Sequence, residues 1–383
     1  MHKILILNND LELGGIQKSL IDFLEYLTSR GGYEINLVLW QKGGVLREKI
    51  PASVNVIERE YVQTWDFITK EKSLIKKVRL FAQYLKFNFY ARMIKKPWLF
   101  YPRIKQHYNT VISYTQTGYP RFYAIDNVSA DKKYLWYHHG SYESTGAVYK
   151  LDKEYYGEFN KLVTVSSANK QMLKKYFPEY SDNLLVVPNI INVKEVIFNS
   201  QMKVSDFNKT VGIFNFVTVG RLSKPKGIDL AIDIATELKK QGLKFKWYFI
   251  GDGDTFLEIS ETINQRHLGD VCVLLGSKEN PYPYMKLADL YIQTSYVESQ
   301  CITIYEALVL KKIIVATDLP PLKDALRNGK LGVLCEPDTM KFAQKIINIL
   351  NDEVAQTNLI EAVEKHKVSN DIAYQTINEL LKI

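Results

Sequence analysis

Short apolar runs separated by segments of mixed polarity recur along most of the chain. The first half contains "KILIL" (3–7), "EINLVLW" (34–40), "VNVI" (54–57), "TVISY" (110–114), "KYLWY" (133–137), "KLVTV" (161–165) and "LLVVP" (184–188). The second half contains "FNFVTVG" (214–220), "KFKWYFIG" (244–251), "VCVLLG" (271–276), "ADLYIQTS" (288–295), "KKIIVAT" (311–317) and "LGVLCEP" (331–337). Runs of this length, with helix-period or loop segments between them, are typical of buried parallel strands. The pattern predicts an α/β fold.

A polar stretch at 192–209 interrupts this alternation and divides the runs into two sets. The 383 residues are enough for two domains of ordinary size. We therefore predict two doubly wound parallel-sheet domains, Rossmann-like in architecture, at 1–195 and 196–365, followed by a helix within 366–383. Ligands of such sheets bind beyond the carboxyl ends of the strands, which predicts a site in the cleft between the domains.

The segment 70–105 departs from the rest of the chain in its charge. It holds eight Lys and three Arg against the single Glu71, while the whole chain has a net charge of only +8. Its apolar residues recur at helical spacing, and Trp98, Phe100 and Tyr101 follow among cations. Two interpretations stay open: a helix packed on a core with a solvated basic face, or a helix docked on an anionic membrane surface through cations and aromatic side chains. Nucleic acid is a weaker candidate, because no recognition motif accompanies the charge.

The cysteines and the lengths of the apolar runs bear on metal binding, secretion and membrane insertion. Cys272, Cys301 and Cys335 are far apart and match no metal-ligand spacing, so we expect a reduced compartment and no metal. The start of the chain has too short an apolar run for a signal peptide, and no run reaches transmembrane length. These features predict a cytoplasmic protein, with 70–105 as a candidate for peripheral attachment to the inner face of the cell membrane.

Candidate phosphate ligands follow two of the predicted strands. Gly220 ends one strand, and Arg221 and Lys226 follow it in a short loop before a helix, where cations and backbone N–H groups favour an anion such as a diphosphate. Gly14 and Gly15 precede the first helix, where they let a ligand approach the backbone or simply form a turn. The dinucleotide-binding fingerprint is absent, since its third glycine and its ribose-binding acid are missing.

Two further groups of polar residues lie at strand ends. His138 and His139 follow the strand that ends in "LWY", and Glu298 and Glu306 stand at a strand-to-helix junction in "YVESQCITIYEALVLKK". Taken alone, local hydrogen bonding accounts for the histidines better than catalysis does. Taken alone, helix capping likewise accounts for the glutamates better than ligand binding does.

The order and spacing of these motifs resemble the family 4 retaining glycosyltransferases, which use nucleotide sugars and have the GT-B fold. In the second half the resemblance rests on "FVTVGRLSKPKGIDLAI", "FIGDGD", "VLLGSKENPYPYMKLADLYIQTSYVES" and "EALVLKKIIVATDLPPLKDAL". In the first half it rests on "LGGIQKSL", "WYHHG", "LVTVSSANKQML" and "VVPNII".

The resemblance implies a role for each candidate residue. Glu298 would contact the donor sugar, Glu306 the nucleotide ribose, and Arg221 and Lys226 the diphosphate, in place of a metal. His138 would act near the donor sugar, with His139 as the alternative on the acceptor side beside Gly14 and Gly15. Gly15 would also contact the donor phosphate. The remaining donor-binding candidates are Gly220, Gly251, Asp252, Ser277, Ser299, Gln300, Cys301 and Ile302.

The same resemblance implies a substrate class and two rival functions. The donor would be a nucleotide sugar, with a UDP-sugar favoured over a GDP-sugar, and no cofactor is expected. The acceptor would be a saccharide, with a polyprenyl-diphosphate-linked glycan of capsule, exopolysaccharide or O-antigen synthesis as the candidate. Many relatives have glycine where this chain has Ser299 and Cys301, which leaves open a non-catalytic partner subunit; a sugar-nucleotide epimerase of the same architecture is the other rival. The resemblance also makes the last helix a candidate to cross back to the first domain.

Overall fold

The computed structural model describes residues 1–60, 62, 64–207 and 209–381. Within these residues the chain forms a seven-stranded sheet in the order β3-β2-β1-β4-β5-β6-β7 and a six-stranded sheet in the order β10-β9-β8-β11-β12-β13. Every described strand pair is parallel, from β1 with β2 to β12 with β13. The predicted α/β architecture of two doubly wound sheets is confirmed.

The first sheet and its helices occupy the amino-terminal half. Its strands are β1 (His2–Asn8), β2 (Tyr33–Leu39), β3 (Asn55–Glu58), β4 (Ile104–Ser113), β5 (Val128–Tyr137), β6 (Lys161–Thr164) and β7 (Leu184–Val186). Its helices are α1 (Gly15–Arg30), α2 (Trp65–Lys70), α3 (Leu74–Asn88), α4 (Pro120–Asp126), α5 (Gly146–Tyr156) and α6 (Ser167–Tyr176). Short helical turns are η1 (Val45–Lys49), η2 (Phe89–Ile94), η3 (Pro97–Phe100) and η4 (Pro178–Asn183).

The second sheet and its helices follow. Its strands are β8 (Phe214–Val219), β9 (Phe245–Ile250), β10 (Cys272–Leu274), β11 (Leu290–Gln293), β12 (Ile313–Thr317) and β13 (Val333–Cys335). The helices are α7 (Val193–Asn199), α8 (Ile228–Lys240), α9 (Phe256–Gln265), α10 (Tyr282–Leu287), α11 (Ile302–Val309), α12 (Pro320–Ala325), α13 (Thr339–Asn351), α14 (Glu353–Lys365) and α15 (Asp371–Leu381), with the short turn η5 (Lys224–Lys226).

Each sheet has an apolar core on both faces, and the chain passes from one pair of cores to the other after β7. Ile190 packs in a core of the first sheet, whereas Ile191 and Val196 pack in a core of the second. The division predicted at 195 and 196 lies next to this change and stays a prediction.

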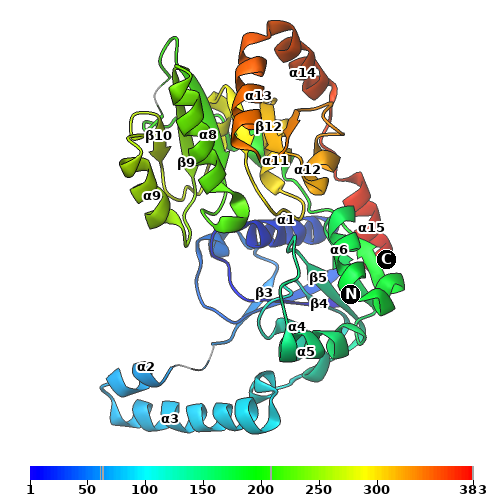
Figure 1. Cartoon of the computed structure of the whole chain (residues 1–383). Coiled ribbons are helices and arrows are strands. Elements are labelled where there is room, and N and C mark those ends of the chain that lie inside the picture. Colours follow the sequence, from blue (N-terminus) through cyan, green and yellow to red (C-terminus); the bar gives the residue numbers. More distant parts are fainter. Residues whose placement is uncertain (61, 63, 208, 382–383) are drawn as a thin grey trace.

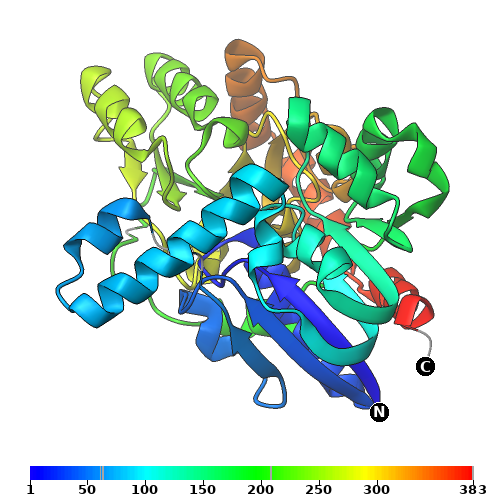
Figure 2. The ribbon, with the colours of Figure 1, turned by 90° about the horizontal axis from the view of Figure 1, so that it is seen from below.

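The last helix, α15, packs on the first domain. Ala373, Ile377 and Leu381 belong to the same core as α1, and the rings of Tyr26 and Tyr374 stack with their centroids 4.2 Å apart. Both views place α15 beside the first domain (Figure 1 and Figure 2). The chain therefore crosses between the domains twice, once after β7 and once before α15.

Helices α2 and α3 form an arm that projects from the first domain, defined here as residues 65–94 (Figure 1). In the view from below, the arm is the part nearest the viewer (Figure 2). None of the residues of α3 is buried, and Leu74, Val78 and Leu85 of its apolar stripe are 75%, 61% and 53% exposed. The interpretation of this stripe as a core-packing face is therefore wrong.

The aromatic residues that follow the arm were expected at a membrane interface, but they pack in the first domain. Trp98 and Tyr101 are buried in the first domain, where the Trp98 indole donates to Asp126, and Phe100 is half-buried against the same core. They anchor the end of the arm, and are not available as interfacial side chains.

Candidate functional site

The carboxyl ends of the second sheet gather most of the predicted donor-binding residues. Lys226 lies in η5 after β8, and Glu298 lies in the loop after β11. The Lys226 Nζ is 2.7 Å from Glu298 Oε1, which also accepts from the Ser295 hydroxyl at 2.7 Å and from the Gln293 amide at 3.3 Å. Burial alone would lower the pKa of Lys226, but the adjacent Glu298 carboxylate outweighs it and the pKa is raised. The structure thus holds a charged pair, the Lys226 ammonium and the Glu298 carboxylate, at the strand ends.

The remaining predicted donor residues border this pair along the same edge. Arg221 is exposed in the loop after β8, and Asp252 and Ser277 are exposed after β9 and β10. Gly251 has a φ of 148°, and a Cβ there would lie 1.9 Å from the Gly220 carbonyl oxygen. Glycine is therefore required where the ends of β8 and β9 approach each other.

Glu306 lies on α11 and is buried. Its Oε1 accepts from the Tyr282 hydroxyl at 3.0 Å and is 3.7 Å from the Lys18 ammonium of α1. Burial raises the pKa of Glu306, although Lys18 and Tyr282 both favour its charged form. The second glutamate of the pair therefore contacts the first domain directly.

Lys18 is a site residue that sequence reasoning missed. Its ammonium also lies 3.3 Å from the Asp22 carboxylate and 3.6 Å from that of Glu195. Burial raises the pKa of Asp22 to about 7 despite Lys18. The four-residue spacing of Lys18 and Asp22 on a predicted helix was the available signal, but only the fold brings Glu306 to them.

The segment 299–302 of the second domain forms hydrogen bonds with the first domain. The Ser299 carbonyl accepts from the Ser166 hydroxyl at 2.6 Å, and the Gln300 side-chain oxygen accepts from the Asn189 backbone N–H at 2.7 Å. Cys301 is buried with a left-handed φ of 59°, and α11 begins at Ile302. Cys301 thus adopts the conformation that glycine would adopt most easily.

The two histidines differ in environment. His138 is 6% exposed, and burial lowers its pKa to about 3, so the ring is neutral near pH 7. Its backbone N–H donates to the Gln116 side-chain oxygen at 3.0 Å. His139 is exposed, and its carbonyl accepts from Asn169. Gln116 was not singled out from the sequence.

Gly140, which ends the "WYHHG" motif, touches the Glu298 loop. A Cβ added at Gly140 would lie 2.3 Å from the Glu298 carbonyl oxygen. This contact brings the end of β5 in the first domain against the Glu298 loop of the second.

Gly14 and Gly15 are placed at the start of α1. Gly14 has an extended φ of −175°, and a Cβ added at Gly15 would meet no atom within 4 Å. Neither glycine is therefore required by the conformation of its own backbone.

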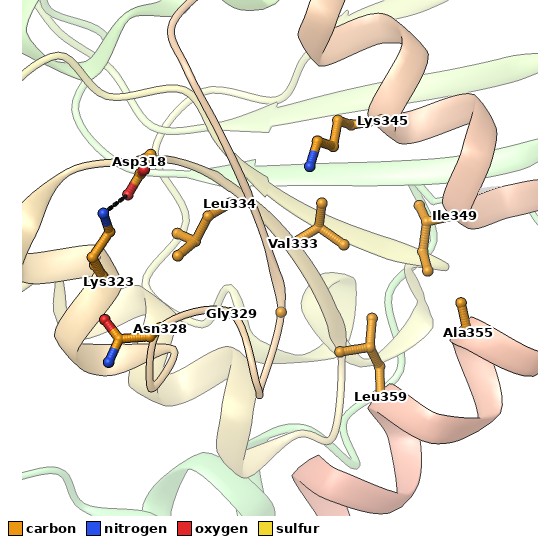
Figure 3. A pocket seen from close by; sticks show the side chains of 11 residues that line it. Asp318, Lys323, Asn328, Gly329, Val333, Leu334, Lys345, Ile349, Ala355 and Leu359 are labelled. Atoms are coloured by element: carbon orange, nitrogen blue, oxygen red, sulfur yellow. Dashed lines mark ion pairs between the residues drawn. The ribbon is translucent and has the colours of Figure 1, made fainter.

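A cavity of about 600 Å³ lies away from these residues, among α12, β13, α13 and α14 (Figure 3). Asp318 and Lys323 form an ion pair of 3.0 Å at one side of it, and Val333, Leu334 and Leu359 line it with apolar groups. None of the predicted site residues lines this cavity.

Searches for a membrane span and for a metal cluster were made over the described residues. No described helix is long and apolar enough to cross a bilayer. Nor does the described part of the chain contain a group of three or more His, Cys, Asp or Glu residues placed to hold a metal ion.

Comparison with protein families and curated proteins identifies the second domain. Residues 201–366 match the family model described as "Glycosyl transferases group 1". A poly(ribitol-phosphate) alpha-N-acetylglucosaminyltransferase of Staphylococcus aureus is 24% identical over 259 residues, which cover 64% of this chain and 50% of that protein. An uncharacterised glycosyltransferase of Methanocaldococcus jannaschii is 24% identical over 212 residues, which cover 51% of this chain and 52% of that protein. The matches thus span about half the length of these relatives.

Solved structures match over the whole chain. A mutant of S. aureus TarM, in complex with fondaparinux, alpha-GlcNAc-glycerol and UDP, superposes with a TM-score of 0.72 at 14% identity and covers 100% of both chains. Anabaena HepE in complex with UDP and glucose superposes with a TM-score of 0.70 at 17% identity, again over 100% of both chains. Residues 201–366 therefore match the group 1 glycosyltransferases, and the chain has the GT-B fold over its full length.

Proposed function

We propose that this protein is a retaining glycosyltransferase that moves a hexose-type sugar from a UDP-sugar to a hydroxyl group of a saccharide acceptor in cell-surface glycan synthesis. The main support is the charged pair of Lys226 and Glu298, with Arg221 on the same loop as Lys226, at the carboxyl ends of the second sheet. Relatives solved with UDP support the choice of nucleotide.

In this proposal the cations act on the leaving diphosphate. Lys226 and Arg221 bind its oxygens and neutralise the charge that grows as the bond from the sugar C1 to the phosphate oxygen breaks. The acceptor hydroxyl forms the new bond to C1 on the face that the diphosphate leaves, and its proton passes to a diphosphate oxygen. Positive charge from these two side chains takes the place of a metal ion.

The carboxylates bind the hydroxyl groups of the donor. Glu298 accepts from the sugar and Glu306 from the ribose, since a charged acceptor forms stronger hydrogen bonds to hydroxyl groups than a neutral one. Both carboxylates already have cationic partners, Lys226 and Lys18. Donor binding therefore exchanges these partners rather than filling empty positions.

The test is nucleotide binding by thermal shift and calorimetry, with UDP, GDP, ADP and TDP. We expect UDP to stabilise the protein, and Arg221→Ala and Lys226→Met each to weaken UDP binding by about 10- to 100-fold, because each removes a charge-assisted hydrogen bond to phosphate. Lys224→Met is the matched control, since Lys224 is an exposed lysine of the same turn. If no nucleotide binds, the non-catalytic partner becomes the better interpretation.

We further propose that the acceptor is lipid-linked and that the arm docks on an anionic membrane, at the inner face of the cell membrane. The apolar stripe of α3 is exposed, and Trp65 of α2 is 48% exposed with its ring 5.6 Å from that of Phe81. The arm and the chain up to residue 105 have an excess of lysine and arginine. Exposed apolar and aromatic side chains beside cations are the combination that binds an anionic bilayer surface.

Flotation with liposomes tests this docking. We expect binding to vesicles that contain phosphatidylglycerol, weaker binding at high salt, and little binding to pure phosphatidylcholine. The double variant Ile75→Ser with Val78→Ser should bind the vesicles more weakly, because it removes part of the apolar face. Vesicle binding should be abolished by reversal of four charges, with Lys76, Lys77, Lys95 and Lys96 changed to Glu. Equal flotation of the charge-reversed variant would refute the proposal. A dimer in light scattering that the apolar-face substitutions dissociate would also refute it, because the stripe would then join two copies of the chain.

A further inference from the structure

Two buried polar side chains stand together at the ends of adjacent strands of the first sheet. Gln116 follows β4 and is 5% exposed, and His138 follows β5 and is 6% exposed. The Gln116 Oε1 accepts from the His138 backbone N–H at 3.0 Å, which ties the two strand ends together.

Each of these side chains has one buried nitrogen without a partner. Among the residues that the structure describes, neither Gln116 Nε2 nor His138 Nε2 has a hydrogen-bond partner, although both atoms are buried. A buried polar atom left unsatisfied is costly, and most such atoms in proteins are paired. Two such atoms, on residues that share a hydrogen bond at the ends of adjacent strands, indicate a ligand that pairs with both.

The hydrogen bonds of His138 indicate which of the two unpaired nitrogens is a donor and which is an acceptor. The ring donates to the backbone carbonyl of Tyr114, and because Nε2 has no partner this donor is Nδ1. A neutral ring with its proton on Nδ1 presents Nε2 as an acceptor, whereas the Gln116 Nε2 carries two N–H donors. One donor and one acceptor together match hydroxyl groups, which both donate and accept.

The neighbouring contacts place this pair at the cleft. Gly140, two residues after His138, approaches the Glu298 backbone so closely that a Cβ would lie 2.3 Å from its carbonyl oxygen. Glu298 is the carboxylate that the proposed function assigns to the donor sugar. The strand ends that carry Gln116 and His138 therefore lie beside the Glu298 loop, to which the proposed function assigns the donor sugar.

We propose that Gln116 is a specificity-determining residue for the transferred sugar: its Nε2 donates to one sugar hydroxyl, and its Oε1 positions His138 so that His138 Nε2 accepts from another. This inference rests on the proposed function. It assigns to Gln116 the recognition of the sugar ring and no part in binding the nucleotide.

Calorimetry with UDP, UDP-glucose and UDP-N-acetylglucosamine tests the assignment on the full chain. We expect the wild-type protein to bind one UDP-sugar more tightly than UDP. Gln116→Met should lose about 2- to 10-fold in affinity for that UDP-sugar while its affinity for UDP is unchanged, because it removes the donor to the sugar and the acceptor that positions His138, neither of which is assigned to the nucleotide. Gln116→Glu keeps an acceptor for the His138 N–H but lacks the donor, and should lose affinity for the UDP-sugar in the same selective way.

Gln344→Met is the control, since Gln344 is an exposed glutamine of α13 whose amide bonds only to Asn348. Full UDP-sugar affinity in both Gln116 variants would overturn the inference and leave the proposed function standing. The same holds if the wild-type protein binds UDP but gains nothing from either sugar. If the wild-type protein binds neither UDP nor the two UDP-sugars, the proposed function and this inference fall together.

Discussion

Substitution of Gly140 by alanine tests whether contact between the domains positions the Glu298 carboxylate. The added Cβ would lie 2.3 Å from the Glu298 carbonyl oxygen and 2.5 Å from its carbonyl carbon, so the two loops must separate by about 1 Å to reach ordinary contact distance. The Lys226–Glu298 hydrogen bond is only 2.7 Å long. A shift of this size therefore breaks the pair or holds the domains apart.

A misplacement of about 1 Å in a reacting group can lower a rate by about 100-fold, or about 2.7 kcal/mol in transition-state free energy. We expect Gly140→Ala to lose sugar transfer, or UDP-sugar hydrolysis where no acceptor is at hand, by this factor. UDP affinity should change by less than about threefold, because the proposed nucleotide-binding residues lie on the second domain. Steady-state kinetics and calorimetry measure the two quantities separately.

Gly269→Ala is the matched control, since a Cβ at Gly269 meets no atom within 4 Å and its φ is not in the left-handed region. It should leave both quantities unchanged. Transfer rates of Gly140→Ala within about twofold of the wild type would refute the argument that this contact sets the position of Glu298.

Two further predictions concern stability. Cys301→Gly should be more stable than Cys301→Ala by about 1 kcal/mol in urea unfolding, because the φ of 59° is left-handed and glycine adopts it without strain. Both substitutions remove the same buried thiol, so its loss cancels in the comparison. An alanine variant of equal or greater stability would exclude backbone strain at this position. Asp22 has a pKa raised to about 7, above its unfolded value near 3.9, so its contribution to stability is fully present below pH 4 and is lost as the pH rises through 7, by up to about 4 kcal/mol. The melting temperature of Asp22→Asn should therefore rise relative to that of the wild type between pH 4 and 7.5, and parallel pH curves would contradict this assignment.

The sequence predicted the strands well because the parallel strands of this fold are buried on both faces. Every predicted apolar run overlaps a strand, from β1 to β13. The runs missed the first residues of β4 and β5, "IKQHYN" and "VSADK", in which polar residues predominate and only Tyr108 and Val128 are buried. These residues pair with each other, so their hydrogen bonds exist without the continuous apolar pattern that reveals a strand.

The arm shows that a sequence pattern can predict a helix without predicting its burial. The helical stripe from Leu74 to Phe89 was recognised as a helix, but periodicity alone cannot tell an apolar face that packs on a core from one that is left exposed. Trp98 and Tyr101, which look interfacial in a basic segment, are buried because the chain turns back into the first domain there. Burial of this kind depends on partners distant in sequence.

The candidate site follows the same division between local and distant partners. Glu298, Lys226 and His138 were found because they stand at strand ends, where the fold class alone predicts a ligand. Lys18 and Gln116 were missed because their significance comes from Glu306 and from the His138 backbone, which are 288 and 22 residues away.

The segment from Ser299 to Cys301, where the resemblance implied glycine at two positions, contacts the first domain. The Ser299 carbonyl and the Gln300 side chain each accept a hydrogen bond from the first domain or its connection, through Ser166 and Asn189. The left-handed Cys301 keeps the turn that glycine would make. Since Glu298 and Glu306 flank this segment, any separation of the two domains must move both of the proposed donor-binding carboxylates relative to the first domain. The proposed function therefore implies that donor binding and domain closure are coupled through this one short segment.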